Sequence, residues 1–151
     1  MDPPFVPEEF SIPSGLSTGP FLLVRLGLEH NEGDLAAWSS SVEHIHATAG
    51  FEGHPWPDEP MTLERNARDL AGHVADWDAR AGFTYSVLGV EDRSVIGCVY
   101  IYPPRDETSD AWVRSWVRAS HAALDADLYR AVDGWLRDAW PFASAEYAAR
   151  P

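Results

Sequence analysis

The sequence predicts a mixed α+β domain in which a mostly antiparallel central sheet is flanked by helices. Short apolar or alternating runs recur along the chain, two long segments repeat apolar residues at helical spacing, and three strand-like runs follow one another without a helix between them. Consecutive strands favour an antiparallel meander, and the helix after them favours a crossover to a parallel neighbour. The expected order of elements is β-α-α-β-β-β-α-β.

The first half of the chain contains one strand and two helices. Residues 21–26 are a short apolar run typical of a strand, and Asn31 offers an N-cap for a helix that continues to about Thr48. Thr62 caps a second helix, which Gly82 is expected to end. Apolar residues three and four apart give each helix one buried face: Leu35, Trp38, Val42 and Ile45 in the first, and Leu63, Ala67, Leu70, Val74, Trp77 and Ala81 in the second.

The second half contains the meander and the crossover helix. Residues 83–88 and 94–102 form a hairpin across residues 89–93, and residues 111–118 alternate as a further strand. Residues 127–139 are helical, Pro141 ends that helix, and residues 145–149 form a last short strand. Residues 1–20 are rich in Pro, Gly and Ser, so we expect an extended leader before a single domain over residues 21–151.

The charge balance indicates which classes of partner the protein can bind. Eleven basic residues face 24 acidic ones, giving a formal net charge of -13. Such a field repels nucleic acids and anionic lipids, so we expect neither as a partner. The N-terminus lacks the basic and apolar regions of a signal peptide, and no apolar run reaches the length of a membrane span, which predicts a cytoplasmic protein. A small cationic amine is the ligand that this charge favours.

Two segments resemble the GNAT (N-acetyltransferase) superfamily. FTYSVLGVEDRSVIGCVYIYP is similar to the second and third strands of that family, with Ile96-Gly97 at a typical position, and WVRSWVRASHAALDADLYRAVDGWL resembles its fourth strand, phosphate loop and third helix. The resemblance extends from about Phe21 to the C-terminus. It implies a GNAT-like fold, acetyl-CoA or another acyl-CoA as donor, and N-acyl transfer to a small amine. It also implies cofactor contacts at Trp116, Val117, Arg118, Ser120, His121 and Ala123.

The phosphate loop departs from the family pattern. Its glycine positions fall on Ala123, Asp125 and Asp127, so two carboxylates stand where phosphate is expected. Like charges about 4 Å apart repel by roughly 4 kcal/mol near a protein surface. The two aspartates also fit an N-cap and first turn of the following helix. The family's later strands, which supply a tyrosine acid, have no counterpart here, and a homodimer that completes the sheet is one expectation.

Several residues are candidates for catalysis. Tyr100 and Tyr102 share a strand face and could donate a proton to a thiolate, or could simply pack in the core. In a GNAT-like fold Glu43 or His44 would border the acceptor site as a general base, although His44 also fits a cation at a helix end. Asp110, just before the third strand of the meander, is a further candidate base.

Other polar residues are interpreted from their spacing. Trp112, Arg114, Trp116 and Arg118 alternate on one strand face, where they could hold an anionic or aromatic ligand or form a packing ladder. The histidines of the Glu43–His46 run lie two apart, which points them away from each other on a helix, so no metal site is expected. The single cysteine, Cys98, is expected to be a small buried hydrophobe.

The sequence therefore leaves three functions open. The first is an acyl-CoA-dependent N-acyltransferase that acts on a small amine. The second is a GNAT-like domain that has lost acetyl-CoA binding and serves as a small-molecule-binding or protein-interaction module. The third is chemistry without a cofactor in the same cleft.

Overall fold

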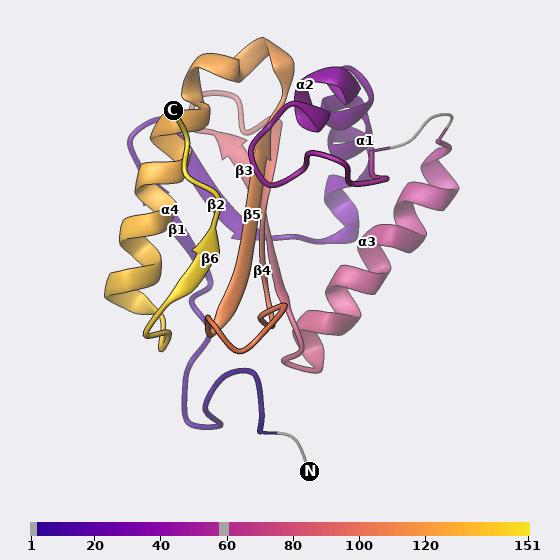
Figure 1. The fold of residues 1–151 in the computed structure, drawn as a ribbon. Coiled ribbons are helices and arrows are strands. Elements are labelled where there is room, and N and C mark those ends of the chain that lie inside the picture. Colours follow the sequence, from indigo (N-terminus) through magenta and orange to yellow (C-terminus); the bar gives the residue numbers. More distant parts are fainter. Residues whose placement is uncertain (1–2, 58–60) are drawn as a thin grey trace.

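A computed structural model describes residues 3–57 and 61–151 of the chain. A six-stranded sheet separates helix α4 from helices α1, α2 and α3 (Figure 1). The strands lie in chain order from β1 to β6. Their bounds are Gly15–Thr18 (β1), Phe21–Arg25 (β2), Phe83–Gly89 (β3), Val95–Tyr102 (β4), Ala111–Val117 (β5) and Ala145–Tyr147 (β6). The helices are Asn31–Ser39 (α1), Val42–His46 (α2), Leu63–Asp78 (α3) and Asp125–Ala139 (α4), with 3-10 turns at Leu28–His30 (η1) and Ala119–Leu124 (η2).

The pairing of the strands confirms the predicted α+β class. Strands β1 to β5 form antiparallel pairs, and β6 runs parallel to β5 after the crossover through α4. The β5–β6 register includes only three pairs, which end at Val113 and Tyr147. After Val113, the edge of β5 that faces β6 therefore has no strand paired with it in the described part of the chain.

Each face of the sheet has its own apolar core. On the α4 side the core includes Val113, Val117, Leu128 and Val132, and on the other side it includes Trp38 and Trp116. The alternation of β5 places its odd residues toward α4 and its even residues toward α1 and α3. Trp112, Arg114 and Trp116 share the second face, as predicted, whereas Arg118 lies past the end of β5 and precedes η2.

The segment before β2 contains a strand that the sequence pattern did not predict. Residues 15–18 lie in the expected leader, yet they pair with β2 as the edge strand β1. Val6 is only 1% exposed in the α4-side core, where Phe5 and Phe10 pack beside it. The leader therefore covers part of that core.

The expected first helix is broken after Ser39, so it forms two helices rather than one. Ser41 Oγ donates to the Ala37 carbonyl at 2.8 Å, and Ser40 Oγ donates to the Ala36 carbonyl at 2.9 Å. Serine hydroxyls that bond to the preceding turn compete with the helical hydrogen bonds and end the helix. Ser41 Oγ also accepts from the Ala119 amide at 2.8 Å, which ties α2 to the end of β5.

Helix α3 ends earlier than predicted. Thr62 caps it as expected, but the helix stops at Asp78, and Arg80 rather than Gly82 adopts a left-handed backbone with φ of 56°. Arg80 donates to the carbonyls of Pro7 and Phe10 at 2.8 and 2.9 Å, which offsets the cost of that conformation. Gly82 is needed for space instead, since a Cβ there would lie 2.2 Å from the Tyr102 ring.

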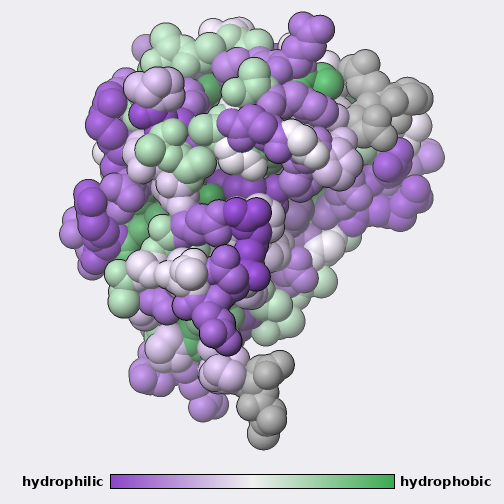
Figure 2. Space-filling view, viewed as in Figure 1, coloured by the Kyte–Doolittle hydropathy of each residue, from purple (hydrophilic) through white to green (hydrophobic). Residues whose placement is uncertain are grey.

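One face of the molecule is mainly polar. Hydrophilic side chains cover most of the face shown in Figure 2. Within residues 3–57 and 61–151, every helix is too short or too polar to span a membrane.

Candidate functional site

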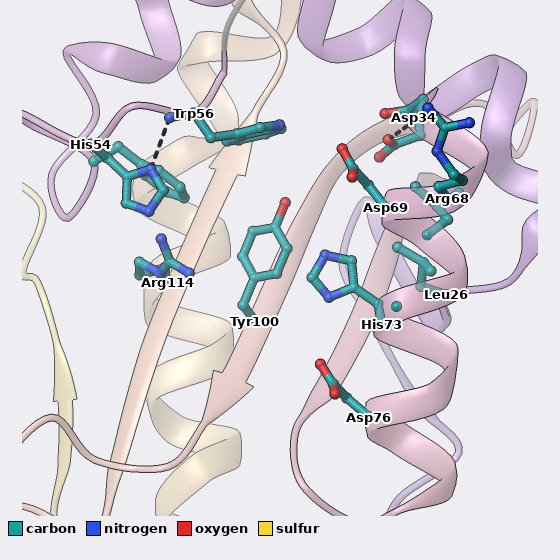
Figure 3. Close-up of a pocket in the computed structure, with 14 residues that line it drawn as sticks. Leu26, Asp34, His54, Trp56, Arg68, Asp69, His73, Asp76, Tyr100 and Arg114 are labelled. Carbon is teal, nitrogen blue, oxygen red and sulfur yellow. Dashed lines mark hydrogen bonds between the residues drawn. The ribbon is translucent and has the colours of Figure 1, made fainter. Parts of the chain in front are cut away.

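A cavity of about 460 Å³ lies between the sheet and helices α1 and α3. Its floor is β4 and β5, and the loop after α2 covers one end (Figure 3). Most of its polar wall is supplied by α3. The residues that line it are Leu26, Asp34, Phe51, His54, Trp56, Asn66, Arg68, Asp69, Leu70, Gly72, His73, Asp76, Tyr100 and Arg114.

Tyr100 is the predicted candidate that lies in this cavity. The Trp116 indole donates from Nε1 to the Tyr100 hydroxyl at 2.8 Å, and both side chains are buried. Burial raises the pKa of Tyr100 well above its usual value, so its hydroxyl stays protonated. Trp116 was expected as a cofactor contact; in the structure its indole fixes the position of the Tyr100 hydroxyl.

Asp34 is a buried carboxylate in the cavity wall. Its side chain accepts from Asn66 Nδ2 at 3.1 Å and from the Cys98 thiol at 3.4 Å, and the residue is 5% exposed. Asn66 also accepts from the Trp38 indole at 3.1 Å, which fixes its amide orientation. Burial raises the pKa of Asp34, although its hydrogen bonds oppose that rise. In the described part of the chain Asp34 has no ion-pair partner.

His73 is oriented by a chain of hydrogen bonds. The Tyr102 hydroxyl donates to Asp76 Oδ2 at 2.7 Å, and His73 Nδ1 lies 2.9 Å from the Tyr102 oxygen and 3.2 Å from Thr84 Oγ1. Because Tyr102 gives its only proton to Asp76, its oxygen accepts from His73 Nδ1, and Nε2 keeps the free lone pair. Burial lowers the pKa of His73, which favours the neutral ring at pH 7. This arrangement makes His73 a proton acceptor at the cavity wall.

The edge of β5 next to the expected cofactor contacts is occupied by the C-terminal residues of the chain. Where β5 extends past its pairing with β6, Arg150 Nη2 donates to the Ser115 carbonyl at 2.7 Å, and Tyr147 OH lies 2.5 Å from Ser115 Oγ. Arg150 Nε also pairs with Asp125 at 2.7 Å, and its Nη1 donates to the Ala49 carbonyl at 3.1 Å. The Arg150 side chain is 3% exposed. We call Arg150, Asp125 and Tyr147 the tail plug.

The phosphate end of that site also differs from the family pattern. The loop forms the 3-10 turn η2, and α4 begins at Asp125 without a side-chain cap. The expected N-cap is wrong, because Leu124 occupies that position, but both aspartates lie in the first turn of α4 as predicted. Asp125 pairs with Arg150, and Asp127 pairs with Arg130. Two carboxylates remain at the helix N-terminus, where a phosphate would need bare amides. As arranged, these residues do not fit an acyl-CoA.

The remaining predicted site residues lie away from the cavity. Glu43 and His44 line a separate hollow beside Ala119, and Asp110 accepts from the amides of Ala143 and Ser144 at 2.7 and 3.2 Å. Asp110 therefore orders the loop before β6. The other predicted cofactor contacts lie at the end of β5 or in and beside η2: Val117, Arg118, Ser120, His121 and Ala123. No group of side chains suited to a metal ion occurs in the described ranges.

The fold is shared with solved acetyltransferases. The Microcin C7 self-immunity acetyltransferase MccE, in complex with acetyl-CoA and AMP, matches with a TM-score of 0.63 at 15% identity, over 84% of this chain and 67% of that one. The ribosomal-protein-S5-alanine acetyltransferase from Vibrio fischeri matches with a TM-score of 0.60 at 13% identity, over 81% and 66%. The chain has the GNAT fold.

A further GNAT-fold neighbour is the ribosomal L7/L12 α-N-protein acetyltransferase RimL in complex with coenzyme A, with a TM-score of 0.60 at 10% identity over 80% of this chain and 66% of that one. The chain spans about two thirds of the length of these structures. No protein-family model matches the sequence, and no curated protein matches it either.

The cavity contains functional candidates that the sequence pattern did not reveal. Asp69, His73 and Asp76 lie four and three residues apart on α3, so they share the helix face that borders the cavity. The helical spacing of these three polar residues could have been read from the sequence, as the spacing of the apolar residues of α3 was. Asp34 carried no such signal, because its place in the cavity depends on Asn66 and Cys98, which are distant in sequence.

Proposed function

We propose that this GNAT-fold chain binds a small protonated amine in the cavity between α1, α3, β4 and β5. The observation that carries the proposal is Asp34, a buried carboxylate that lines the cavity and lacks a cation within the described residues. A buried charge without a counter-charge is costly, and a cationic ligand reduces that cost. The net charge of -13 also attracts cations to the molecule.

The apolar part of the wall suits the carbon chain of such a ligand. The rings of Phe51, Trp56 and Tyr100 lie close together, with centroids 6.1 to 6.5 Å apart. Alkyl chains pack well against such aromatic side chains. The cavity volume lies in the range typical of small-molecule sites.

An NMR titration with n-butylamine at pH 7.5, compared with n-butanol, tests the proposal. We expect the amine to bind at least tenfold more tightly than the alcohol, and Asp34→Asn to weaken amine binding by at least tenfold. Asp133→Asn is the matched control, because it makes the same charge change on α4, on the other side of the sheet. Equal affinity of the amine and the alcohol, or an amine affinity that Asp34→Asn leaves unchanged, would contradict the proposal.

Acyl-CoA-dependent N-acyl transfer is the second candidate, and the acetyl-CoA and CoA complexes of structural neighbours support it. In that case the cavity would hold the acceptor amine, and His73 Nε2 could take a proton from it. The tail plug would first have to leave Ser115 and the start of α4.

Thermal unfolding with acetyl-CoA separates the two candidates, with free CoA and ATP as controls. Saturation at a hundredfold excess over Kd would stabilise the chain by about 2.7 kcal/mol, or roughly 5–10 °C. A shift specific to acetyl-CoA and CoA would favour the transferase. Amine binding without such a shift would favour a binding module.

A further inference from the structure

Arg114 presents a second uncompensated charge to the same cavity. Its guanidinium lies over the rings of Trp112, Phe51 and Tyr100 at 4.3, 5.3 and 5.4 Å from their centroids. No carboxylate among residues 3–57 and 61–151 lies within ion-pair distance of it. The side chain is half-buried, and this burial lowers the pKa of Arg114. Its aromatic neighbours hold the cation in place without neutralising it.

Two other arginines that lie over aromatic rings, Arg105 and Arg25, each have a carboxylate partner. Arg105 also lies over Trp112, at 4.8 Å, but it is exposed and pairs with Glu146 outside the cavity. Arg25 lies over Trp77 and pairs with Asp78 at 2.6 Å. A half-buried arginine that lines a cavity and lacks a carboxylate partner is a typical site for an anionic group of a ligand.

The two unpaired charges lie on opposite sides of the cavity. Figure 3 shows Arg114 on β5 beside His54, and Asp34 beyond Tyr100 on the side of α3, with His73 between them. The α3 wall adds the carboxylates of Asp69 and Asp76, and Arg68 lines that wall without forming an ion pair with Asp34. The cavity is therefore positive at its β5 end and acidic at its α1–α3 end.

We propose that the ligand is a zwitterion, with a carboxylate that pairs with Arg114 and a protonated amine that lies toward Asp34 and the acidic face of α3. This inference rests on the proposed amine binding and adds a second recognition point to it. A guanidinium binds a carboxylate through two parallel hydrogen bonds, so the anionic end would be fixed in direction as well as in place. An amine without an anionic group would leave Arg114 unpaired. A simple carboxylate would leave Asp34 unpaired.

A length series tests this inference by NMR titration at pH 7.5. The probes are the ω-amino acids from glycine to 6-aminohexanoate, and each is compared with the n-alkylamine and the n-alkyl carboxylate of equal length. We expect one length to bind at least tenfold more tightly than both of its single-charge analogues, because each end adds a charge-assisted hydrogen bond. Arg114→Met should remove this advantage, and it should not weaken binding of the alkylamine, because the lost guanidinium carries the same sign of charge as the amine.

Arg105→Met is the matched control, because it removes an arginine from the same Trp112 ring outside the cavity, and it should keep the zwitterion preference. If Arg114→Met does not fold, Arg114→Lys keeps the charge but not the two parallel bonds, and should reduce the advantage. If amines bind and no ω-amino acid gains over them in the wild type, the zwitterion inference is overturned while amine binding stands. If neither class binds, both proposals are overturned.

Discussion

Replacement of Arg150 by methionine tests how firmly the tail plug closes the open edge of β5. Methionine keeps much of the apolar stem but removes every guanidinium hydrogen bond. Arg150 donates to Asp125 and to the carbonyls of Ser115, Ala49 and Ala148. The variant therefore leaves a carboxylate and several carbonyls without their donor.

The expected loss of stability follows from burial. Removing one partner of a fully buried ion pair costs about 3–5 kcal/mol. Here the Arg150 side chain is 3% exposed and Asp125 is 19% exposed, so water can partly solvate the remaining carboxylate. Asp125 also lies in the first turn of α4, where the helix dipole stabilises an anion by about 0.3–1 kcal/mol. We therefore expect Arg150→Met to lose about 2–3 kcal/mol, or roughly 4–12 °C in Tm.

Urea unfolding followed by tryptophan fluorescence measures this loss. Asp125→Asn and the double variant complete a double-mutant cycle, in which we expect a coupling of about 1–2 kcal/mol. Arg137→Met is the matched control, because Arg137 forms an exposed pair with Asp133 on α4 and should cost no more than about 0.5 kcal/mol. A loss below about 0.5 kcal/mol for Arg150→Met, with no coupling to Asp125, would refute the tail plug.

Three further predictions concern the cavity and the sheet. Burial raises the pKa of Asp34 above its ordinary 3.8, so ionisation of this carboxyl opposes folding. The wild type should therefore lose stability relative to Asp34→Asn as pH rises from 4 to 7, which the difference between their Tm values measures. Tyr100→Phe leaves the buried Trp116 indole without an acceptor and should cost about 1–3 kcal/mol in urea unfolding. Gly97→Ala puts a Cβ 2.2 Å from the Trp116 carbonyl and should cost at least about 2 kcal/mol, whereas Gly134→Ala on α4 meets nothing and should gain about 1 kcal/mol.

Periodicity along the chain predicted most of the fold. Helices α3 and α4 and strands β3, β4 and β5 each repeat apolar residues over seven or more positions, so their type could be predicted from the sequence. Strand β1 has four residues of Gly, Leu, Ser and Thr, and it forms because β2 offers an edge for pairing. The break between α1 and α2 depends on where two serine hydroxyls point, which apolar spacing does not record.

The site was less predictable, because its contacts join distant segments. Tyr100 could be identified as a candidate because the alternation of its strand shows which residues share its face. Arg150 and Ala49 are 101 residues apart, and Asp34 and Cys98 are 64 apart, so local patterns do not reveal that they meet. The glycines missing from the phosphate loop predicted a departure from the family pattern at this position, without indicating what lies there. The ion pair between Arg150 and Asp125 at this position depends on the tertiary structure, so the sequence alone did not reveal it.

Strand β5 separates the cavity from the tail plug. Its even residues, including Arg114, face the cavity, while its free edge at Ser115 is bound by Arg150. The cavity keeps uncompensated charges, whereas the tail plug satisfies its own charges through buried hydrogen bonds. A buried charge without a counter-charge is costly, and a ligand of complementary charge in the cavity would reduce that cost for Asp34 and Arg114. The two sides meet at the β5 backbone and at the loop after α2, where the Ala49 carbonyl accepts from Arg150 and Phe51 lines the cavity. Neither Arg114 nor Asp34 forms an ion pair with a plug residue in the described part of the chain, so we expect Arg150→Met to change stability without changing the zwitterion preference. A loss of that preference in Arg150→Met would mean that the plug also shapes the cavity.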